Sequence, residues 1–182
     1  MYRLVLAAAT LAIAGCGYNR IQTLDEQVNA YKGQIEVQLQ RRADLVPNLV
    51  EVVKGFAAQE KAIFDAVTGA RAQLAGAIKG SNLAEMATAN GALTGALGRL
   101  IAIAEDNPEI KSNENFRMLQ DQLEGTENRI SVARQDYNNA VREYNAYIRA
   151  FPQVLTAKAT GAHARDYFEA DAAAQAAPKV EF

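Results

Sequence analysis

The stretch that decides the fold is residues 112–152, SNENFRMLQDQLEGTENRISVARQDYNNAVREYNAYIRAFP. Apolar and aromatic residues recur along it at alternating spacings of three and four, a heptad pattern that predicts one long helix with a single buried face. Pro152 ends the predicted helix, because the residue before a proline avoids the helical region. The predicted buried positions are Phe116, Leu119, Leu123, Thr126, Ile130, Ala133, Tyr137, Ala140, Tyr144, Tyr147 and Phe151.

A second apolar seam predicts a helix over residues 82–106. Asn82 and Glu85 have the spacing of a capping box and follow Gly80, a residue type that commonly ends the preceding helix. Asn107 and Pro108 end this helix and begin the next one, since proline is tolerated in a first turn. The seam consists of Leu83, Met86, Asn90, Leu93, Leu97, Leu100 and Ala104.

A third seam begins at Ile21 and keeps its phase, with one slip, across Pro47 as far as Leu74. It predicts one long helix from about residue 21 to residue 79, kinked at Pro47, where a backbone hydrogen bond is lost. The alternative is a true break, with Asp44 capping a new helix. The predicted fold class is all-α: an up-and-down antiparallel bundle of three to four long helices, the first one kinked or broken near Pro47.

The first sixteen residues predict that the chain is targeted to a membrane. Residues 4–14 form an apolar run of about 11 residues, the length of a signal-peptide core and too short to span a bilayer. It leads into Ile13-Ala14-Gly15-Cys16, which resembles the bacterial lipobox. That resemblance implies cleavage after residue 15 and lipidation of Cys16. The alternative is an uncleaved signal anchor. Residue 17 is Gly and not Asp, so the inner-membrane retention signal is absent and an outer-membrane location follows in a bacterium with two membranes.

These patterns divide the chain into four parts. They are a lipoprotein signal peptide (1–15), a lipid-anchored linker (16–20), a helical bundle (21–151) and an Ala-rich C-terminal tail (152–182). One short helix is expected in the tail, around residues 165–170.

Composition excludes several classes of function. The 182 residues carry 19 Lys and Arg against 21 Asp and Glu, a formal net charge of −2, which argues against binding to nucleic acid. The chain has one Cys and one His, so neither an internal disulfide nor a Cys-based zinc site can form. We therefore expect no metal and no cofactor.

Polar side chains crowd two of the predicted helices. They are interpreted either as a groove that binds an acidic or amide-bearing ligand, or as a charge and amide network that fixes helix register, and the second is favoured. Glu124 and Glu127 lie one turn apart, as an acid pair would, but no nucleophile or His accompanies them, so an enzyme is not predicted. The candidate residues are Gln38, Arg41, Arg42, Asp44, Asn48, Glu124, Glu127, Asn128, Arg129 and Arg134.

Several blocks of the sequence resemble the LemA family. They are residues 17–19 (GYN), 37–50 (VQLQRRADLVPNLV), 53–57 (VKGFA), 123–130 (LEGTENRI), 133–141 (ARQDYNNAV), 151–152 (FP) and 167–169 (YFE). The resemblance covers roughly residues 17–169 and implies a bacterial, membrane-anchored helical bundle with most of the chain outside the cytoplasm. It implies no defined activity. Many family members carry a longer spanning helix at the N-terminus, where this chain has a lipobox-like end.

The predicted function is a non-enzymatic scaffold or adaptor, anchored by lipid and offering helical surfaces to a protein partner. The alternative is a binding module for a cell-wall fragment or another small envelope ligand. A single kinked first helix would leave the seams of residues 21–35 and 137–151 without a partner inside the chain. A second copy or another envelope protein is then expected to cover them. A true break at Pro47 would instead cover everything within one chain.

Overall fold

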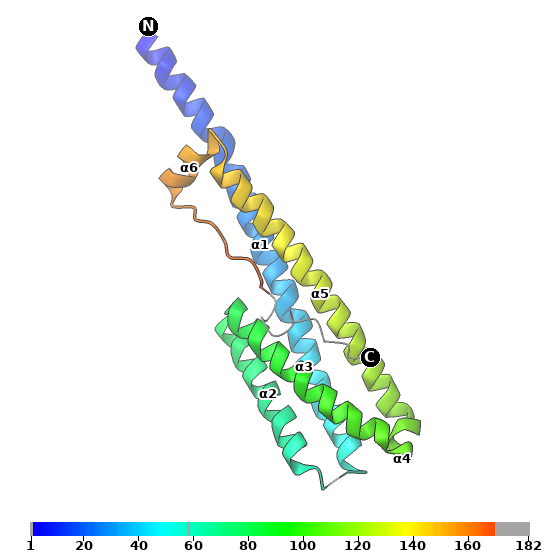
Figure 1. Ribbon diagram of the computed structural model, residues 1–182. Coiled ribbons are helices and arrows are strands. Elements are labelled where there is room, and N and C mark those ends of the chain that lie inside the picture. Colours follow the sequence, from blue (N-terminus) through cyan, green and yellow to red (C-terminus); the bar gives the residue numbers. More distant parts are fainter. Residues whose placement is uncertain (1, 58, 170–182) are drawn as a thin grey trace, which may run out of the picture. The chain divides into compact units, whose positions relative to one another are not determined.

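A computed structural model describes the backbone of residues 2–57 and 59–169, and the side chains from residue 17 onward. Over this part the chain forms helices and no strand, which confirms the all-α class (Figure 1). The helices are α1 (Tyr2–Lys54), α2 (Lys61–Gly80), α3 (Leu83–Asp106), α4 (Pro108–Ser112), α5 (Glu114–Arg149) and α6 (Gln153–Thr160).

The chain divides into two compact units, and α1 and α5 contribute to both. Unit 1 comprises Met1–Gln34 and Ala133–Tyr167, and unit 2 comprises Ile35–Val132 and Phe168–Phe182. Each unit has buried apolar residues of its own.

In unit 1, the first part of α1 and the last part of α5 lie side by side and run antiparallel (Figure 1). Ile21, Leu24 and Val28 of α1 are at most 2% exposed, and Tyr137 and Tyr144 of α5 are 3% exposed. The expectation that these two seams lack a partner inside the chain is therefore wrong, because they cover each other.

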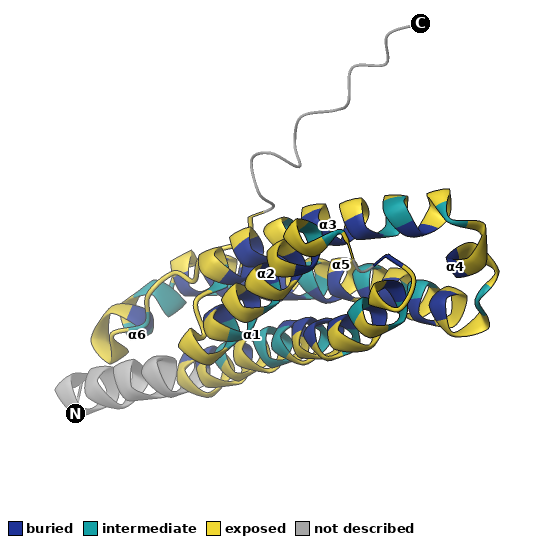
Figure 2. Ribbon diagram, turned by 90° about the horizontal axis from the view of Figure 1, so that it is seen from below, coloured by how far each residue is buried: buried dark blue, intermediate teal, exposed yellow. Residues whose placement is uncertain are grey.

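Unit 2 contains the second part of α1, the α2–α3 hairpin, α4 and the first part of α5. Apolar side chains of all these helices are buried, and along each helix buried positions alternate with exposed ones (Figure 2). The tight turn between α2 and α3 forms at Ser81, which has a left-handed backbone with φ of 52°. The predicted cap of α3 is confirmed, since the Asn82 side chain accepts hydrogen bonds from the N–H groups of Ala84 and Glu85.

The first long helix neither breaks at Pro47 nor continues to residue 79. The helix α1 runs through Pro47 and ends at Lys54, and residues 55–60 separate it from α2. Proline has no N–H for the carbonyl four residues earlier, that of Ala43. In unit 2 this carbonyl accepts a hydrogen bond of 2.8 Å from Nε of Arg71 on α2. A tertiary contact thus replaces the missing helical bond, so no cap at Asp44 is needed.

Two segments outside the predicted bundle also differ from expectation. Residues 17–20, predicted as a linker, belong to α1. In the predicted tail, the helix is α6, ended by the left-handed Gly161 with φ of 72°, and residues 161–169 form no helix. The predicted helix around residues 165–170 is therefore wrong over the part described. Its backbone is engaged elsewhere, because the N–H of Arg165 bonds to the side chain of Asn145.

Candidate functional site

Arg42 lies at the centre of the predicted polar cluster in unit 2. Only 5% of the residue is exposed. Its Nη1 donates a hydrogen bond of 3.1 Å to Oδ1 of Asn90 on α3 and forms an ion pair with the carboxylate of Glu127 on α5. A guanidinium stays charged, and a buried charge is costly unless it is paired. Arg42 therefore links three helices of unit 2 at one level.

A second polar contact joins α1 to α5 within the same unit. Nε of Arg129 donates to Oε1 of Gln38 at 3.2 Å. Gln38 lies one helical turn before Arg42, so the two contacts act at neighbouring levels of the same pair of helices. Together they fit a network that fixes the register of α1 against α5.

The other candidate residues of unit 2 lie at the surface. Asp44 accepts a hydrogen bond from Gln40 at 2.8 Å within α1, and Glu124 accepts one from Gln120 at 3.4 Å within α5. Arg41, Asn48 and Asn128 are exposed as well. The structure thus brings Gln38, Arg42, Glu127 and Arg129 into direct contacts and leaves the remaining candidates of this unit exposed.

Arg134 belongs to the portion of α5 that is in unit 1, whereas the Arg42 cluster belongs to unit 2. Its side chain is half-buried, and burial lowers its pKa below the usual range of an arginine. The sequence placed Arg134 in the same polar set as Arg42 because both lie in charged stretches. The division of α5 between two units separates them.

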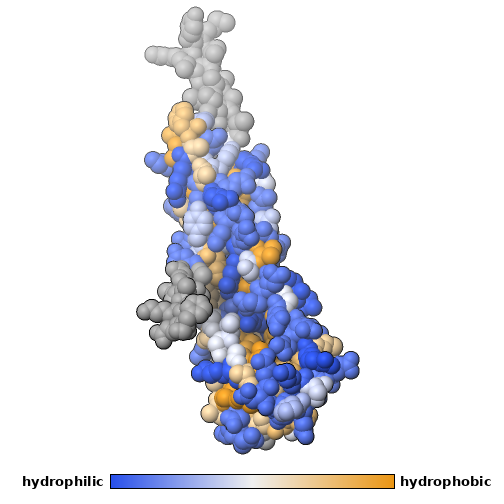
Figure 3. Space-filling model, turned by 45° about the vertical axis from the view of Figure 1, so that its right-hand side comes forward, coloured by the Kyte–Doolittle hydropathy of each residue, from blue (hydrophilic) through white to orange (hydrophobic). Residues whose placement is uncertain are grey.

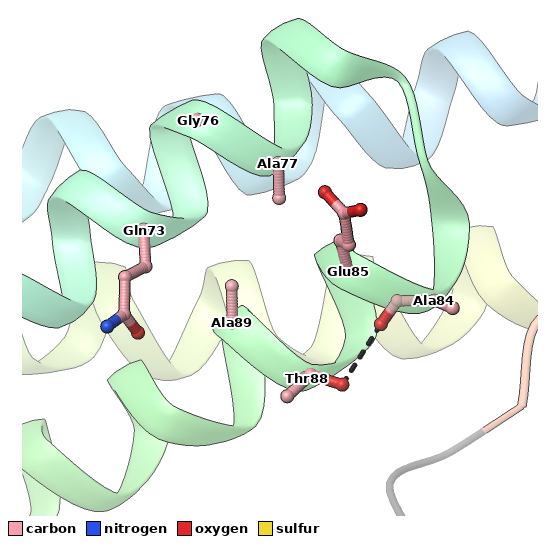
Figure 4. Close-up of a pocket in the computed structure, with 7 residues that line it drawn as sticks. All are labelled: Gln73, Gly76, Ala77, Ala84, Glu85, Thr88 and Ala89. Atoms are coloured by element: carbon pink, nitrogen blue, oxygen red, sulfur yellow. Dashed lines mark hydrogen bonds between the residues drawn. The ribbon is translucent and has the colours of Figure 1, made fainter.

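The cavities of unit 2 lie away from the Arg42 cluster. One of about 510 Å³ lies between α2 and α3, and its polar side chains are Gln73 of α2 and Glu85 and Thr88 of α3 (Figure 4). Another of about 430 Å³ lies between α1 and α5 and includes Asn48, a predicted candidate. Both are open depressions of the surface rather than enclosed cavities. The first is lined by Gln73, Gly76, Ala77, Ala84, Glu85, Thr88 and Ala89, and the second by Asn48, Glu51, Val52, Asn115, Met118 and Leu119.

Unit 1 contains a polar cluster that the sequence analysis missed. The guanidinium of Arg165 makes two hydrogen bonds of 2.9 Å to the carboxylate of Asp25 on α1. The buried amide of Asn145 on α5 pairs with the backbone N–H and C=O of Arg165, each at 2.8 Å. The hydroxyl of Tyr137 donates to the backbone carbonyl of Asp166 at 2.9 Å. The segment after α6 is thereby held on unit 1, and we call these contacts the Arg165 clamp.

The sequence does contain one signal for this clamp. Val141, Asn145 and Ile148 follow a four-three spacing, so Asn145 lies on an apolar strip of α5. An amide on such a strip is buried and needs hydrogen-bond partners. Those partners come from a segment 20 residues away in sequence, which helical periodicity does not locate.

Two tyrosines of this region are hard to ionise. Burial raises the pKa of Tyr137 above 10.0, with Asp166 adding to the shift and Arg165 opposing it. Burial also raises the pKa of Tyr144, with a further contribution from Asp25. Both hydroxyls therefore stay protonated at neutral pH and serve as hydrogen-bonding groups.

The predicted lipidation site lies outside the side chains that the structure describes, since these begin at residue 17. Over the described residues, no three His, Cys, Asp or Glu side chains are grouped in a way that could hold a metal ion. Searched over the same residues, none of the helices includes a stretch long and apolar enough to cross a bilayer.

The sequence model of the LemA family matches residues 31–182. The chain belongs to the LemA family. Magnetosome protein MamQ 2 of Paramagnetospirillum magneticum is 30% identical over 175 residues, which cover 84% of this chain and 64% of that protein. Magnetosome protein MamQ of Magnetospirillum gryphiswaldense is 29% identical over 174 residues, covering 83% and 64%. The LemA-family chain thus spans slightly less than two thirds of the length of these relatives.

The family assignment agrees with the geometry of the polar cluster. Residues 37–50 and 123–130 are two of the blocks by which the sequence resembles the LemA family. The first supplies Arg42 and the second supplies Glu127, and the two side chains form an ion pair. The LemA-like blocks therefore meet in unit 2 at the buried cation.

Proposed function

We propose that this LemA-family chain is a non-enzymatic, membrane-anchored protein of the bacterial cell envelope that acts as a scaffold or adaptor. A lipid on Cys16 holds it at the membrane, in the outer membrane where there are two, with the folded part facing away from the cytoplasm. Its helical surfaces engage a protein partner or a second copy.

The observation that supports this role most directly is the burial of Gly17. A Cβ at this position would lie 3.4 Å from Cγ of Gln153 and 3.8 Å from Oγ1 of Thr156, so α6 packs against α1 at residue 17. A lipid on Cys16 would then join the folded part with no flexible spacer. This arrangement suits a protein that presents a fixed surface at the membrane.

The contacts of the acidic residues favour a non-enzymatic role. Glu127, half of the acid pair considered for a hydrolase, is engaged in an ion pair with Arg42. Glu124 is exposed and bonded to Gln120 on its own helix. Neither carboxylate lines the cavities described above.

The anchoring is tested by producing the full chain in a bacterium and analysing its membranes. Mass spectrometry should show that residues 1–15 are absent and that Cys16 carries acyl chains. The matched control is Cys16→Ser, which should accumulate with residues 1–15 still present. A wild-type protein that keeps its N-terminus, and a Cys16→Ser variant that stays equally firmly in membranes, would establish the signal anchor instead. Cross-linking and pull-down of the intact lipoprotein from solubilised membranes then test the adaptor role.

A second function, ligand binding, is favoured by the cavity that contains Asn48. Its rim carries the amides of Asn48 and Asn115 and the carboxylate of Glu51, while Val52 and Leu119 contribute apolar surface. These groups suit an amide-bearing cell-wall fragment. Calorimetric titration of the full chain with a muropeptide should then show saturable binding that Asn48→Leu abolishes. The exposed Asn128→Leu is the matched control, and equal weakening by both variants would contradict the site.

A further inference from the structure

Exposed apolar side chains gather at the turn between α5 and α6 of unit 1. Phe151 is 80% exposed and Leu155 is 59% exposed, the first being the most exposed large apolar side chain of the described residues. In Figure 3, hydrophobic residues gather at the end of unit 1 that carries α6. Contiguous exposed apolar surface marks an interaction site. We call Arg149, Phe151, Leu155 and Lys158 the α6 surface.

The α6 surface lies beside the predicted anchor. Gly17 packs against Gln153 and Thr156 of α6, and residue 17 directly follows Cys16. One residue of helix advances the chain by about 1.5 Å. If residue 16 is held at a bilayer, the residues of α6 that pack against Gly17 lie close to the same bilayer. The position of the apolar patch next to the anchor therefore favours the bilayer as its binding partner.

The charges around the patch complement an anionic bilayer. Between residues 144 and 165 the chain has Arg149, Lys158 and Arg165 and no Asp or Glu, and the exposed Asp166 follows directly. Arg165 is paired with Asp25, whereas Arg149 and Lys158 are exposed. The carboxylate just before this stretch, Glu143, forms an ion pair of 2.5 Å with Arg20. Basic side chains flanking exposed apolar ones are typical of surfaces that lie in the headgroup region.

We propose that the α6 surface is a second membrane contact. Phe151 and Leu155 enter the interfacial region of the leaflet that holds the lipid on Cys16, and Arg149 and Lys158 contact anionic headgroups. Tyr18 is 45% exposed one residue after Gly17, in keeping with the preference of tyrosine for this depth. The inference rests on the proposed anchoring at residue 16 and adds a protein surface that lies on the bilayer. Two membrane contacts fix the orientation of unit 1, which a lipid alone does not.

The absence of tryptophan from the chain makes this contact measurable. The full lipoprotein carrying Phe151→Trp is reconstituted into vesicles of phosphatidylethanolamine and phosphatidylglycerol, with or without lipids brominated on their acyl chains. The matched control is Val37→Trp, since Val37 is 63% exposed and belongs to unit 2. Bromine should quench most of the Phe151→Trp emission and leave that of Val37→Trp unchanged. Circular dichroism checks that both variants keep the helical content of the parent.

Flotation of the same vesicles measures the anchoring separately. If the protein floats and Phe151→Trp is not quenched, the α6 surface does not touch the bilayer and the inference is wrong, while the anchoring stands. If the emission shifts to the blue without quenching, a protein covers the patch, which also overturns the inference. If the protein does not float, the anchoring itself fails and the inference fails with it. Quenching of Phe151→Trp alone, in floating vesicles, supports both.

Discussion

Arg71 is the residue that we expect to let α1 pass through Pro47 without a break. The carbonyl of Ala43 loses its helical donor because residue 47 is proline, and Nε of Arg71 donates to it at 2.8 Å. Ala43 is only 1% exposed, so water is not a ready substitute. Arg71→Met keeps most of the aliphatic stem and removes the donor. The substitution should therefore leave a buried carbonyl without a partner.

The expected loss of stability follows from the two contributions to the free energy of unfolding that Arg71→Met changes. A hydrogen bond from a charged donor contributes about 1.5–3 kcal/mol, and a buried carbonyl left unpaired costs about 1–3 kcal/mol. The two values describe partly the same loss, so they are not added. Because Arg71 is half-buried, we expect Arg71→Met to lower the free energy of unfolding by about 2 kcal/mol. In a Pro47→Ala background, the restored N–H of residue 47 can donate to Ala43. There the same substitution should cost about 0.5 kcal/mol or less. The coupling energy between positions 47 and 71 is then about 1.5 kcal/mol.

Urea unfolding of the full chain, followed by circular dichroism, gives the four free energies of the double-mutant cycle. Arg99→Met, at an exposed arginine of α3, is the matched control and should change stability by less than about 0.5 kcal/mol. Equal losses from Arg71→Met in the Pro47 and Pro47→Ala backgrounds would refute the reasoning, because Arg71 would then stabilise unit 2 by another route. A loss no larger than that of the control would refute it as well.

Three other substitutions test the remaining contacts. Arg42→Met leaves the partners of Arg42 on α3 and α5 unpaired. It should therefore lower the free energy of unfolding, measured in urea, by about 1–3 kcal/mol. A loss equal to that of Arg99→Met would contradict the register role. Asn145→Ala removes both hydrogen bonds to the segment after α6, so amide hydrogen exchange should become faster in that segment and stay the same in α3. An unchanged exchange rate in the segment after α6 would contradict the Arg165 clamp. The pKa of Tyr137 is raised above 10.0 chiefly by burial, so the folded chain keeps a proton that the unfolded chain releases first. Its contribution is complete below pH 10.0 and is lost as pH rises through the raised pKa, and Tyr137→Phe should make the alkaline decline in stability shallower. A decline as steep as that of the parent would show that another group causes it.

The heptad seam from Phe116 to Tyr144 could be predicted because its positions follow from local periodicity. Each predicted seam position from Phe116 to Tyr144 is buried, whereas Tyr147 is only half-buried and its neighbour Ile148 is buried instead. The pattern fails at its end, where Phe151 continues the apolar spacing but is 80% exposed. The helix has stopped at Arg149, so the spacing no longer places the side chain on a helical face.

The break between α1 and α2 could not be predicted from periodicity. Phe56 keeps the apolar phase of the flanking helices and Glu60 falls on the same seam, so the heptad spacing continues through residues 55–60. Gly55 was the available signal, since glycine commonly ends helices. Pro47 is the stronger local signal for the end of a helix, but α1 continues through it. The carbonyl of Ala43 that Pro47 leaves without a donor bonds to Arg71, a residue 28 positions away. The same holds for the partnership of Arg42 with Asn90, because a seam pattern places both residues inside but does not pair them.

The apolar seams of α1 and α5 specify that the helices pair, but they do not by themselves specify the register. If α5 slides along α1 by seven residues, about 10.5 Å, each apolar seam position is replaced by the equivalent position of the next heptad. In one direction such a shift would replace Glu127 by Arg134 opposite the buried Arg42, which places two cations together. In the other direction it would offer the neutral Gln120, which leaves the guanidinium without a counter-charge. Burial makes both alternatives costly, because an unpaired charge loses its hydration. The polar residues of unit 2 therefore select one register among several that the apolar pattern permits, which gives the buried charge of Arg42 a structural role.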